Sequence, residues 1–148
     1  MQNKYMKLFT AFIALALFAS VSVMAKENSA SVKTQQNSIT WVYNLSEGLT
    51  LARAAKKPLM VDFYAEWCGW CKKLDKNVYT NSEVAALSKE FVCVKVDTDK
   101  FGKDASKYAV QGLPTIEFLN ADGTVIDSLV GYAAAPDFAS KMKKVLKK

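Results

Sequence analysis

Two cysteines three positions apart, Cys68 and Cys71, are the residues of this chain with the most evident chemistry. Trp67 precedes the first and Trp70 precedes the second, within the stretch AEWCGWCKK at residues 65–73. A cysteine pair at this spacing can hold a metal ion, close a structural disulfide or exchange electrons with another disulfide. The rest of the chain distinguishes between these three chemistries.

A metal site is the first alternative, and the composition argues against it. A structural zinc site takes four ligands, commonly Cys and His, but the chain of 148 residues has no histidine and only one further cysteine, Cys93. Cys93 falls in a predicted strand, so the three thiols do not make a convincing tetrahedral set. The missing imidazole also excludes nucleophilic catalysis by a Cys–His pair. We therefore expect no metal and no cofactor.

A purely structural disulfide is the second alternative. Cross-linking residues three apart removes little entropy from the unfolded chain, so a disulfide between them stabilises the fold only slightly. Redox exchange is favoured instead, because the backbone N–H groups and the dipole at a helix N-terminus stabilise a thiolate at Cys68. Lys72 and Lys73 add positive charge nearby. We expect Cys68 to attack a substrate disulfide and Cys71, one turn into the helix and more buried, to resolve the mixed disulfide.

Asp62 is the candidate acid–base residue. It interrupts the apolar run Leu59–Tyr64 (LMVDFY), six residues before Cys68. A carboxylate in a buried strand is costly and its pKa rises, which suits proton transfer near neutral pH. Asp62 is therefore predicted to accept and donate the proton of the resolving cysteine. The alternative is that Asp62 is an ordinary acid at the end of a strand, paired with a surface residue. Lys95, in the next predicted strand, is either its buried partner or a solvated residue at a strand end.

The elements that must position these residues follow from hydrophobic patterning and turn signals. Strands are predicted at 39–43, 59–64, 91–97, 115–119 and 124–130, the last two joined by a turn at 120–123. Helices are predicted at 46–56, from the cysteine pair to about 78, from a capping box at Thr80 and Glu83 to about 90, at 103–108, and from Pro136 to the end. Strands alternating with helices, followed by a hairpin and a closing helix, predict an α/β fold with a mixed central β-sheet flanked by helices. The cysteine pair then lies at the carboxyl edge of the sheet, where open α/β sheets place their chemistry.

The N-terminal region has the pattern of an export signal. Lys4 and Lys7 precede an uncharged apolar run at 8–23, and small residues lead up to Ala25. We interpret 1–25 as a signal peptide, 26–38 as a flexible polar linker and 39–148 as the folded domain; an uncleaved anchor is the alternative. The protein is then expected to be periplasmic or secreted. The chain carries a net charge of +6, but an exported chain without a nucleic-acid-binding motif is not expected to bind nucleic acid.

With these residues in place, the chain resembles the thioredoxin family over 39–148. The stretch 61–72 (VDFYAEWCGWCK) is similar to the signature of the family, 111–115 (QGLPT) is similar to its cis-proline loop, and Gly131 matches the glycine after the last strand. Within the family it is most similar to exported thioredoxin-like modules, including the C-terminal domain of DsbD-type thiol:disulfide interchange proteins. The resemblance implies a thioredoxin fold with Pro114 cis beside the cysteines and the backbone of Leu113 offered to an extended substrate.

The resemblance also implies a substrate-binding surface at Trp67, Gly69 and Trp70. Trp70 departs from the family, because ordinary thioredoxins have proline and strong oxidants usually have histidine at this position. This intervening pair tunes the redox potential, so the direction of electron flow stays open. Cys93 is the odd thiol, either a buried small hydrophobe or a partner in a regulatory or intermolecular disulfide.

We expect a monomeric protein-disulfide oxidoreductase that acts on disulfide-containing proteins, more as a reductase or interchange enzyme than as an oxidant. Because reduction outside the cytoplasm needs a supply of electrons, a membrane thiol-disulfide donor is expected as a partner. The alternatives are a disulfide-donating oxidant and a thioredoxin-like binding module whose disulfide stays closed.

Overall fold

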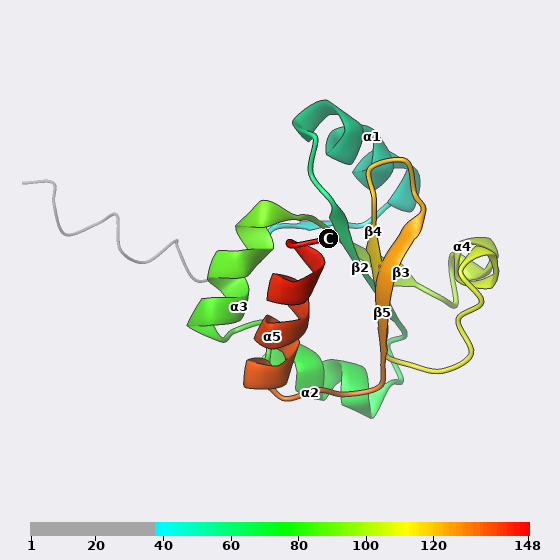
Figure 1. The fold of residues 1–148 in the computed structure, drawn as a ribbon. Helices are drawn as coiled ribbons and strands as arrows, with labels where there is room; N and C mark the ends of the chain where they lie inside the picture. Colours follow the sequence, from blue (N-terminus) through cyan, green and yellow to red (C-terminus); the bar gives the residue numbers. More distant parts are fainter. Residues whose placement is uncertain (1–37) are drawn as a thin grey trace, which may run out of the picture. The chain divides into compact units, whose positions relative to one another are not determined.

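The computed structural model describes residues 38–148 (Figure 1). The predicted signal peptide and all but the last residue of the predicted linker lie outside the described residues. Within 38–148, none of the helices has the length and apolar character needed to cross a membrane.

The elements follow the predicted order, with shifts of one or two residues at most of their ends. The strands are β1 Trp41–Val42, β2 Leu59–Tyr64, β3 Val92–Asp97, β4 Thr115–Leu119 and β5 Val125–Val130. The α-helices are α1 Leu45–Ala55, α2 Gly69–Asn77, α3 Ser82–Leu87, α4 Gly102–Lys107 and α5 Ala135–Val145, and one turn of 3-10 helix, η1, covers Ser88–Glu90. The predicted strand at 39–43 is therefore reduced to two residues.

The five strands form one mixed sheet in the order β1-β3-β2-β4-β5. The β1, β3 and β2 strands are parallel, while β4 is antiparallel to both β2 and β5. The central strand β2 is buried over Leu59–Phe63, as its near-continuous apolar run predicts. The predicted fold class, a mixed sheet flanked by helices, is confirmed.

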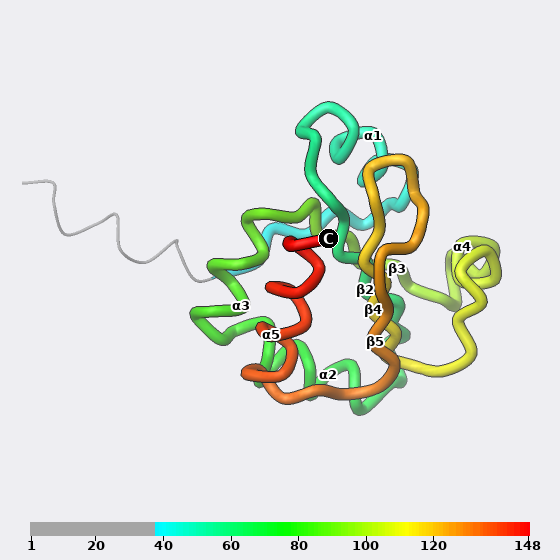
Figure 2. The backbone as a smooth tube through the Cα atoms, in the orientation of Figure 1, coloured from blue at the N-terminus to red at the C-terminus, as the bar shows by residue number. Residues whose placement is uncertain are grey.

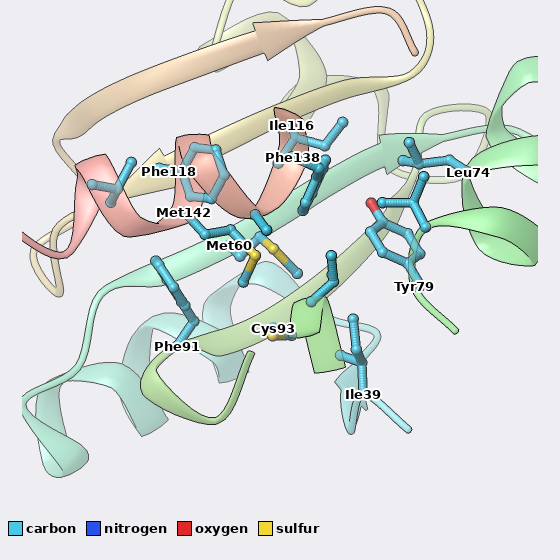
Figure 3. Packing of buried hydrophobic residues seen from close by; sticks show 14 residues of the cluster. Ile39, Met60, Leu74, Tyr79, Phe91, Cys93, Ile116, Phe118, Phe138 and Met142 are labelled. Carbon is cyan, nitrogen blue, oxygen red and sulfur yellow. The ribbon is translucent and has the colours of Figure 1, made fainter. Parts of the chain in front are cut away.

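Helices cover both faces of the sheet. On one face, Phe138 and Met142 of α5 pack against Met60 and Phe118 of the sheet, together with Leu74 of α2 (Figure 3). The other face packs against α1 and α4 through residues such as Leu45, Ala52 and Ala105. Figures 1 and 2 show α3 and α5 on one side of the strands and α4 on the other.

The alternation of side chains in β2 and β3 decides which residues face α2. Met60 belongs to the core cluster of the α5 face, whereas Val61 and Phe63 belong to the cluster of the opposite face. Asp62 lies two residues after Met60 and is in register with Lys95 of β3. Because side chains alternate along a strand, both charged residues lie on the face that α2 covers.

The start of α3 corrects one sequence prediction. The capping residue is Asn81, whose side-chain oxygen accepts hydrogen bonds from the N–H groups of Glu83 and Val84, at 3.0 and 3.3 Å. The predicted cap, Thr80, instead donates its hydroxyl hydrogen to the carbonyl of Lys76 in the preceding turn. Asparagine caps a helix as well as threonine does, and the turn after α2 brings Asn81 into the capping position.

The last helix is held by contacts across its whole length. Pro136 lies in its first turn, as predicted, and Phe138 is fully buried. Near its end, Lys141 and Lys148 donate to the two oxygens of Asp127 on β5, at 2.8 and 3.0 Å. These two ammonium groups hold the pKa of Asp127 well below its usual range.

Candidate active site

Cys68 and Cys71 form a disulfide at the point where β2 leads into α2. The sulfur atoms are 2.07 Å apart and the Cα atoms 5.3 Å apart. Cys68 is the N-cap residue of α2, and its sulfur accepts a hydrogen bond from the N–H of Cys71 at 3.1 Å. The sulfur therefore occupies the position in which a side-chain oxygen usually caps a helix, next to otherwise unpaired backbone donors.

Exposure does not separate the two cysteines in the disulfide form. Cys68 is 5% exposed and Cys71 is 2% exposed, so Cys71 is the more buried as predicted, but the difference is small and both are buried. Ala65, Tyr64 and Leu113 pack around the pair. The asymmetry between the two sulfurs comes from their places on the helix, since Cys68 precedes the first turn and Cys71 lies within it.

Asp62 is buried on β2, the strand that leads into this site. It is 1% exposed, and neither carboxylate oxygen has a hydrogen-bond partner among the described residues. Burial raises the pKa of Asp62 to about 6, although the positive charge of Lys95 opposes the rise. The carboxylate therefore titrates close to neutral pH, as a proton acceptor must.

Lys95 is shared between two carboxylates. Its ammonium nitrogen lies 3.5 Å from Oδ2 of Asp62 and 2.5 Å from Oδ1 of Asp75. The ammonium also lies 4.8 Å from the ring centroid of Tyr64 and 5.5 Å from that of Tyr79. Burial lowers the pKa of Lys95, but the two carboxylates outweigh it and the net pKa is raised. Lys95 thus stays protonated while Asp62 titrates.

Sequence reasoning missed Asp75 and Tyr79. Asp75 follows Cys71 by four residues on α2, which places both on one face of the helix, and this spacing was the available signal. The hydroxyl of Tyr79 is buried without a hydrogen-bond partner among the described residues. Burial and the nearby charge of Asp62 raise its pKa well above the ordinary value. No sequence pattern links Tyr79 to Asp62, because their proximity depends on how the chain turns after α2.

A cavity of about 490 Å³ opens beside Cys71. Its lining includes Cys71, Asp75 and Lys95, together with the rings of Tyr64 and Tyr79. Asp62 is not part of this lining. The cavity brings solvent to Cys71, Asp75 and Lys95.

A second surface lies at the cis-proline loop. The peptide bond between Leu113 and Pro114 is cis, as the resemblance implies. The carbonyl of Pro114 accepts a hydrogen bond from the N–H of Gly131 at 2.8 Å, which ties the loop to the end of β5. Gly131 has φ +84°, a left-handed conformation that glycine adopts without strain. Leu113 packs against the cysteine pair, so the loop and the disulfide form one continuous surface.

Both tryptophans of the motif are exposed, and each is held by a different neighbour. Trp67, 70% exposed, donates its indole N–H to Oδ2 of Asp99, 3.0 Å away. Trp70, 57% exposed, lies against the ring of Tyr132, with the two centroids 5.7 Å apart. The two tryptophans of the predicted substrate-binding surface are therefore exposed, and their contacts with Asp99 and Tyr132 were not predicted. At Gly69, between them, an added Cβ would meet no atom within 4 Å, so the surface there is open.

Two further predictions concern the remaining cysteine and metals. Cys93 is free and buried in the core cluster with Phe91, where burial raises its pKa to about 12. It thus packs as a small apolar side chain. Within 38–148, no group of three or more Cys, Asp or Glu side chains has the geometry to hold a metal ion.

Comparison with known proteins matches this fold. The family model for the thioredoxin-like domain covers residues 45–146. The thiol:disulfide interchange protein DsbD of Vibrio vulnificus is 34% identical over 144 residues, covering 88% of this chain but only 24% of that protein. A thioredoxin of Mycoplasmoides gallisepticum is 35% identical over 94 residues, covering 64% of this chain and 86% of that one. The solution structure of a thioredoxin from Thermus thermophilus superposes with a TM-score of 0.67 at 29% identity, covering 74% of this chain and 88% of that one.

The fold and the Cys68–Cys71 pair define the class of the protein, a thioredoxin-like domain with a disulfide at the start of α2. The chain belongs to the thioredoxin-like family, since the family model matches most of its length. It spans about a quarter of the length of the DsbD relatives that it matches.

Proposed function

We propose that this chain is an exported thiol-disulfide oxidoreductase that reduces or exchanges protein disulfides through the Cys68–Cys71 pair. The observation that carries the proposal is the disulfide at the N-terminus of α2, packed against Leu113 of the cis-proline loop. The pair caps a helix and closes only a small loop, which favours reversible exchange over a structural role.

In the reduced protein, the thiolate of Cys68 attacks one sulfur of a substrate disulfide. The substrate S–S bond breaks, a mixed disulfide forms with Cys68, and the first substrate thiolate leaves and takes up a proton. Cys71 then loses its proton and attacks the sulfur of Cys68, which closes the intramolecular disulfide and releases the second substrate sulfur as a thiolate that takes up a proton from solvent. The substrate gains two electrons and the Cys68–Cys71 dithiol loses two.

Asp62 is the proposed acceptor for the proton that leaves Cys71. Its support is burial on the strand that leads into the site, the absence of a hydrogen bond to either oxygen within 38–148, and a pKa raised to about 6. Lys95 partly offsets the buried negative charge of Asp62 before the proton arrives and again after the proton has left. The cavity beside Cys71 then offers a path by which the proton reaches solvent.

Continued reduction needs a donor of two electrons for each turnover. The similarity to DsbD supports a membrane thiol-disulfide partner in this role. Export rests on the predicted signal peptide at 1–25, which places the domain in the periplasm or outside the cell, and we propose that it acts as a monomer. Fractionation of tagged full-length chain tests this location directly, because a cytoplasmic product would contradict it.

Turnover tests the oxidoreductase proposal against a binding module whose disulfide stays closed. Reduction of insulin by dithiothreitol should be accelerated by the protein and not by its Cys68→Ser variant. A binding module would give no catalysed turnover with either chain.

The reduction potential tests the direction of electron flow. The helix N-terminus, Lys72 and Lys73 stabilise the Cys68 thiolate, but the chain has no histidine to add to them. We therefore expect a value nearer to about −270 mV, as in thioredoxin, than to about −120 mV, as in the oxidant DsbA. Equilibration against glutathione measures it, and a value above about −160 mV would make the protein an oxidant.

A further inference from the structure

A cationic aromatic cluster lies beside the redox pair. It consists of Trp70 and Lys73 on α2 and Tyr132 in the loop between β5 and α5, which passes along α2 in Figure 1. The ammonium of Lys73 lies 4.7 Å from the ring centroid of Trp70 and 5.0 Å from that of Tyr132. Thus α2 and the loop after β5, which are far apart in sequence, hold the ammonium of Lys73 over the exposed ring of Trp70, which lies between the two cysteines.

The ammonium of Lys73 is free to bind an incoming acid. Within 38–148 it has neither an ion pair nor a hydrogen bond, whereas five other lysines pair with carboxylates: Lys95, Lys100, Lys141, Lys143 and Lys148. The aromatic faces attract the positive charge and restrict where it can move. The rings do not accept hydrogen bonds from the ammonium as a carboxylate would. Lys73 can therefore still form a charge-assisted hydrogen bond with an acidic group.

On the side of Cys68 away from Lys73, the charged group is acidic. Trp67 donates its indole N–H to the carboxylate of Asp99, in the loop after β3. In the sheet, β3 lies on one side of β2 while β5 lies on the other, beyond β4. A segment that crosses Cys68 along this edge therefore meets an acidic group at one end and Lys73 at the other.

We propose that Trp70, Lys73 and Tyr132 form a specificity-determining subsite for an acidic side chain near the reacting cysteine of a protein substrate. This inference rests on the proposed function and narrows its substrate class. The carboxylate of the bound segment pairs with Lys73 while its methylene groups lie on the face of Trp70. Tyr132 acts as a positioning residue that holds Lys73 and Trp70 in place.

The test compares two peptide disulfides that differ only in having Glu or Gln at the residues flanking the cysteine. The ratio of kcat/KM for the Glu peptide to that for the Gln peptide is measured with the reduced protein. The same thiolate attacks both peptides, so any effect of a variant on Cys68 itself cancels in the ratio. For an exposed ion pair we expect a ratio of roughly two to five at low ionic strength, falling toward one as salt is added.

The variants separate this subsite from a general electrostatic effect. Lys73→Glu should invert the ratio to below one, and Lys73→Gln, which adds no new charge, should bring it to about one. Tyr132→Ala should lower the ratio, because the ammonium loses one of the two rings that hold it. Lys76→Glu is the matched control, an exposed lysine one turn further along α2, and it should preserve the ratio.

A ratio of about one in the unaltered protein would overturn the inference, while turnover of both peptides would leave the proposed function intact. Equal losses for Lys73→Glu and Lys76→Glu would also overturn it, because the general charge of α2 would then be responsible. Failure to reduce either peptide or insulin would overturn both the inference and the proposed function.

Discussion

Replacing Asp62 with asparagine should stabilise the protein at neutral pH. The substitution keeps the shape of the side chain but removes a charge that is buried without a hydrogen bond within 38–148. The pKa of Asp62 is raised by burial from 3.8 to about 6, so the folded state holds the proton more tightly than the unfolded state does. The contribution of Asp62 to the free energy of unfolding is fully present below about pH 4 and is lost as the pH rises through 6.

The magnitude follows from the same two pKa values. A difference of about two units corresponds to about 3 kcal/mol of destabilisation at pH 7, at about 1.4 kcal/mol for each unit. The amide of the variant brings two N–H donors into a site where the carboxylate had the ion pair with Lys95, 3.5 Å away, and leaving these donors unpaired costs about 1–3 kcal/mol at every pH. Asp62→Asn should therefore gain up to about 2 kcal/mol at pH 7.5 and gain nothing, or lose, at pH 4.

Urea unfolding of the oxidised protein and the variant, at pH 4 and at pH 7.5, measures this change. Asp127→Asn is a control of opposite sign, because Lys141 and Lys148 lower the pKa of Asp127 and the ionised form is the stabilising one. That variant should lose stability at neutral pH and approach the parent at low pH. A difference between parent and Asp62→Asn that does not vary with pH would refute the buried, titrating carboxylate.

The Asp62→Asn variant should also turn over more slowly near neutral pH, and equal turnover across the range above pH 6 would leave Asp62 a structural residue.

The other expectations concern the cysteines and the packing that holds the site. Cys68→Ser should abolish attack on disulfides and Cys71→Ser should accumulate mixed disulfides with substrates on non-reducing gels; trapping by the first variant and not the second would reverse the roles. Phe138→Ala should lower the free energy of unfolding by about 3–5 kcal/mol, because this side chain is fully buried between α5 and the sheet. A loss below about 1 kcal/mol in denaturant unfolding would show that α5 contributes little to that core. Gly48→Ala should destabilise by about 1–3 kcal/mol, since the added Cβ would collide with a methyl of Val94. An increase in stability would mean that α1 shifts to make room.

Much of the fold could be predicted because its signals are local. The apolar run of β2, the turn before β5 and the proline in the first turn of α5 each act within a few residues. Element ends were less well defined, because neighbouring residues compete for the same backbone groups. Asn81 rather than Thr80 caps α3 for this reason, and sequence alone gives little ground for choosing between them.

The amino-acid sequence by itself determined the kind of chemistry in this protein. A cysteine pair at a helix N-terminus, an isolated acid in a buried strand and the absence of histidine leave few options other than thiol-disulfide exchange. Tertiary structure decided which groups surround the two sulfurs. Asp75 meets Lys95, and Tyr132 meets Trp70, only because β3 and the loop after β5 are brought against α2. Such contacts join residues about 20 and 60 positions apart, and a distance between side chains depends on the packing of the whole sheet rather than on any spacing along the chain.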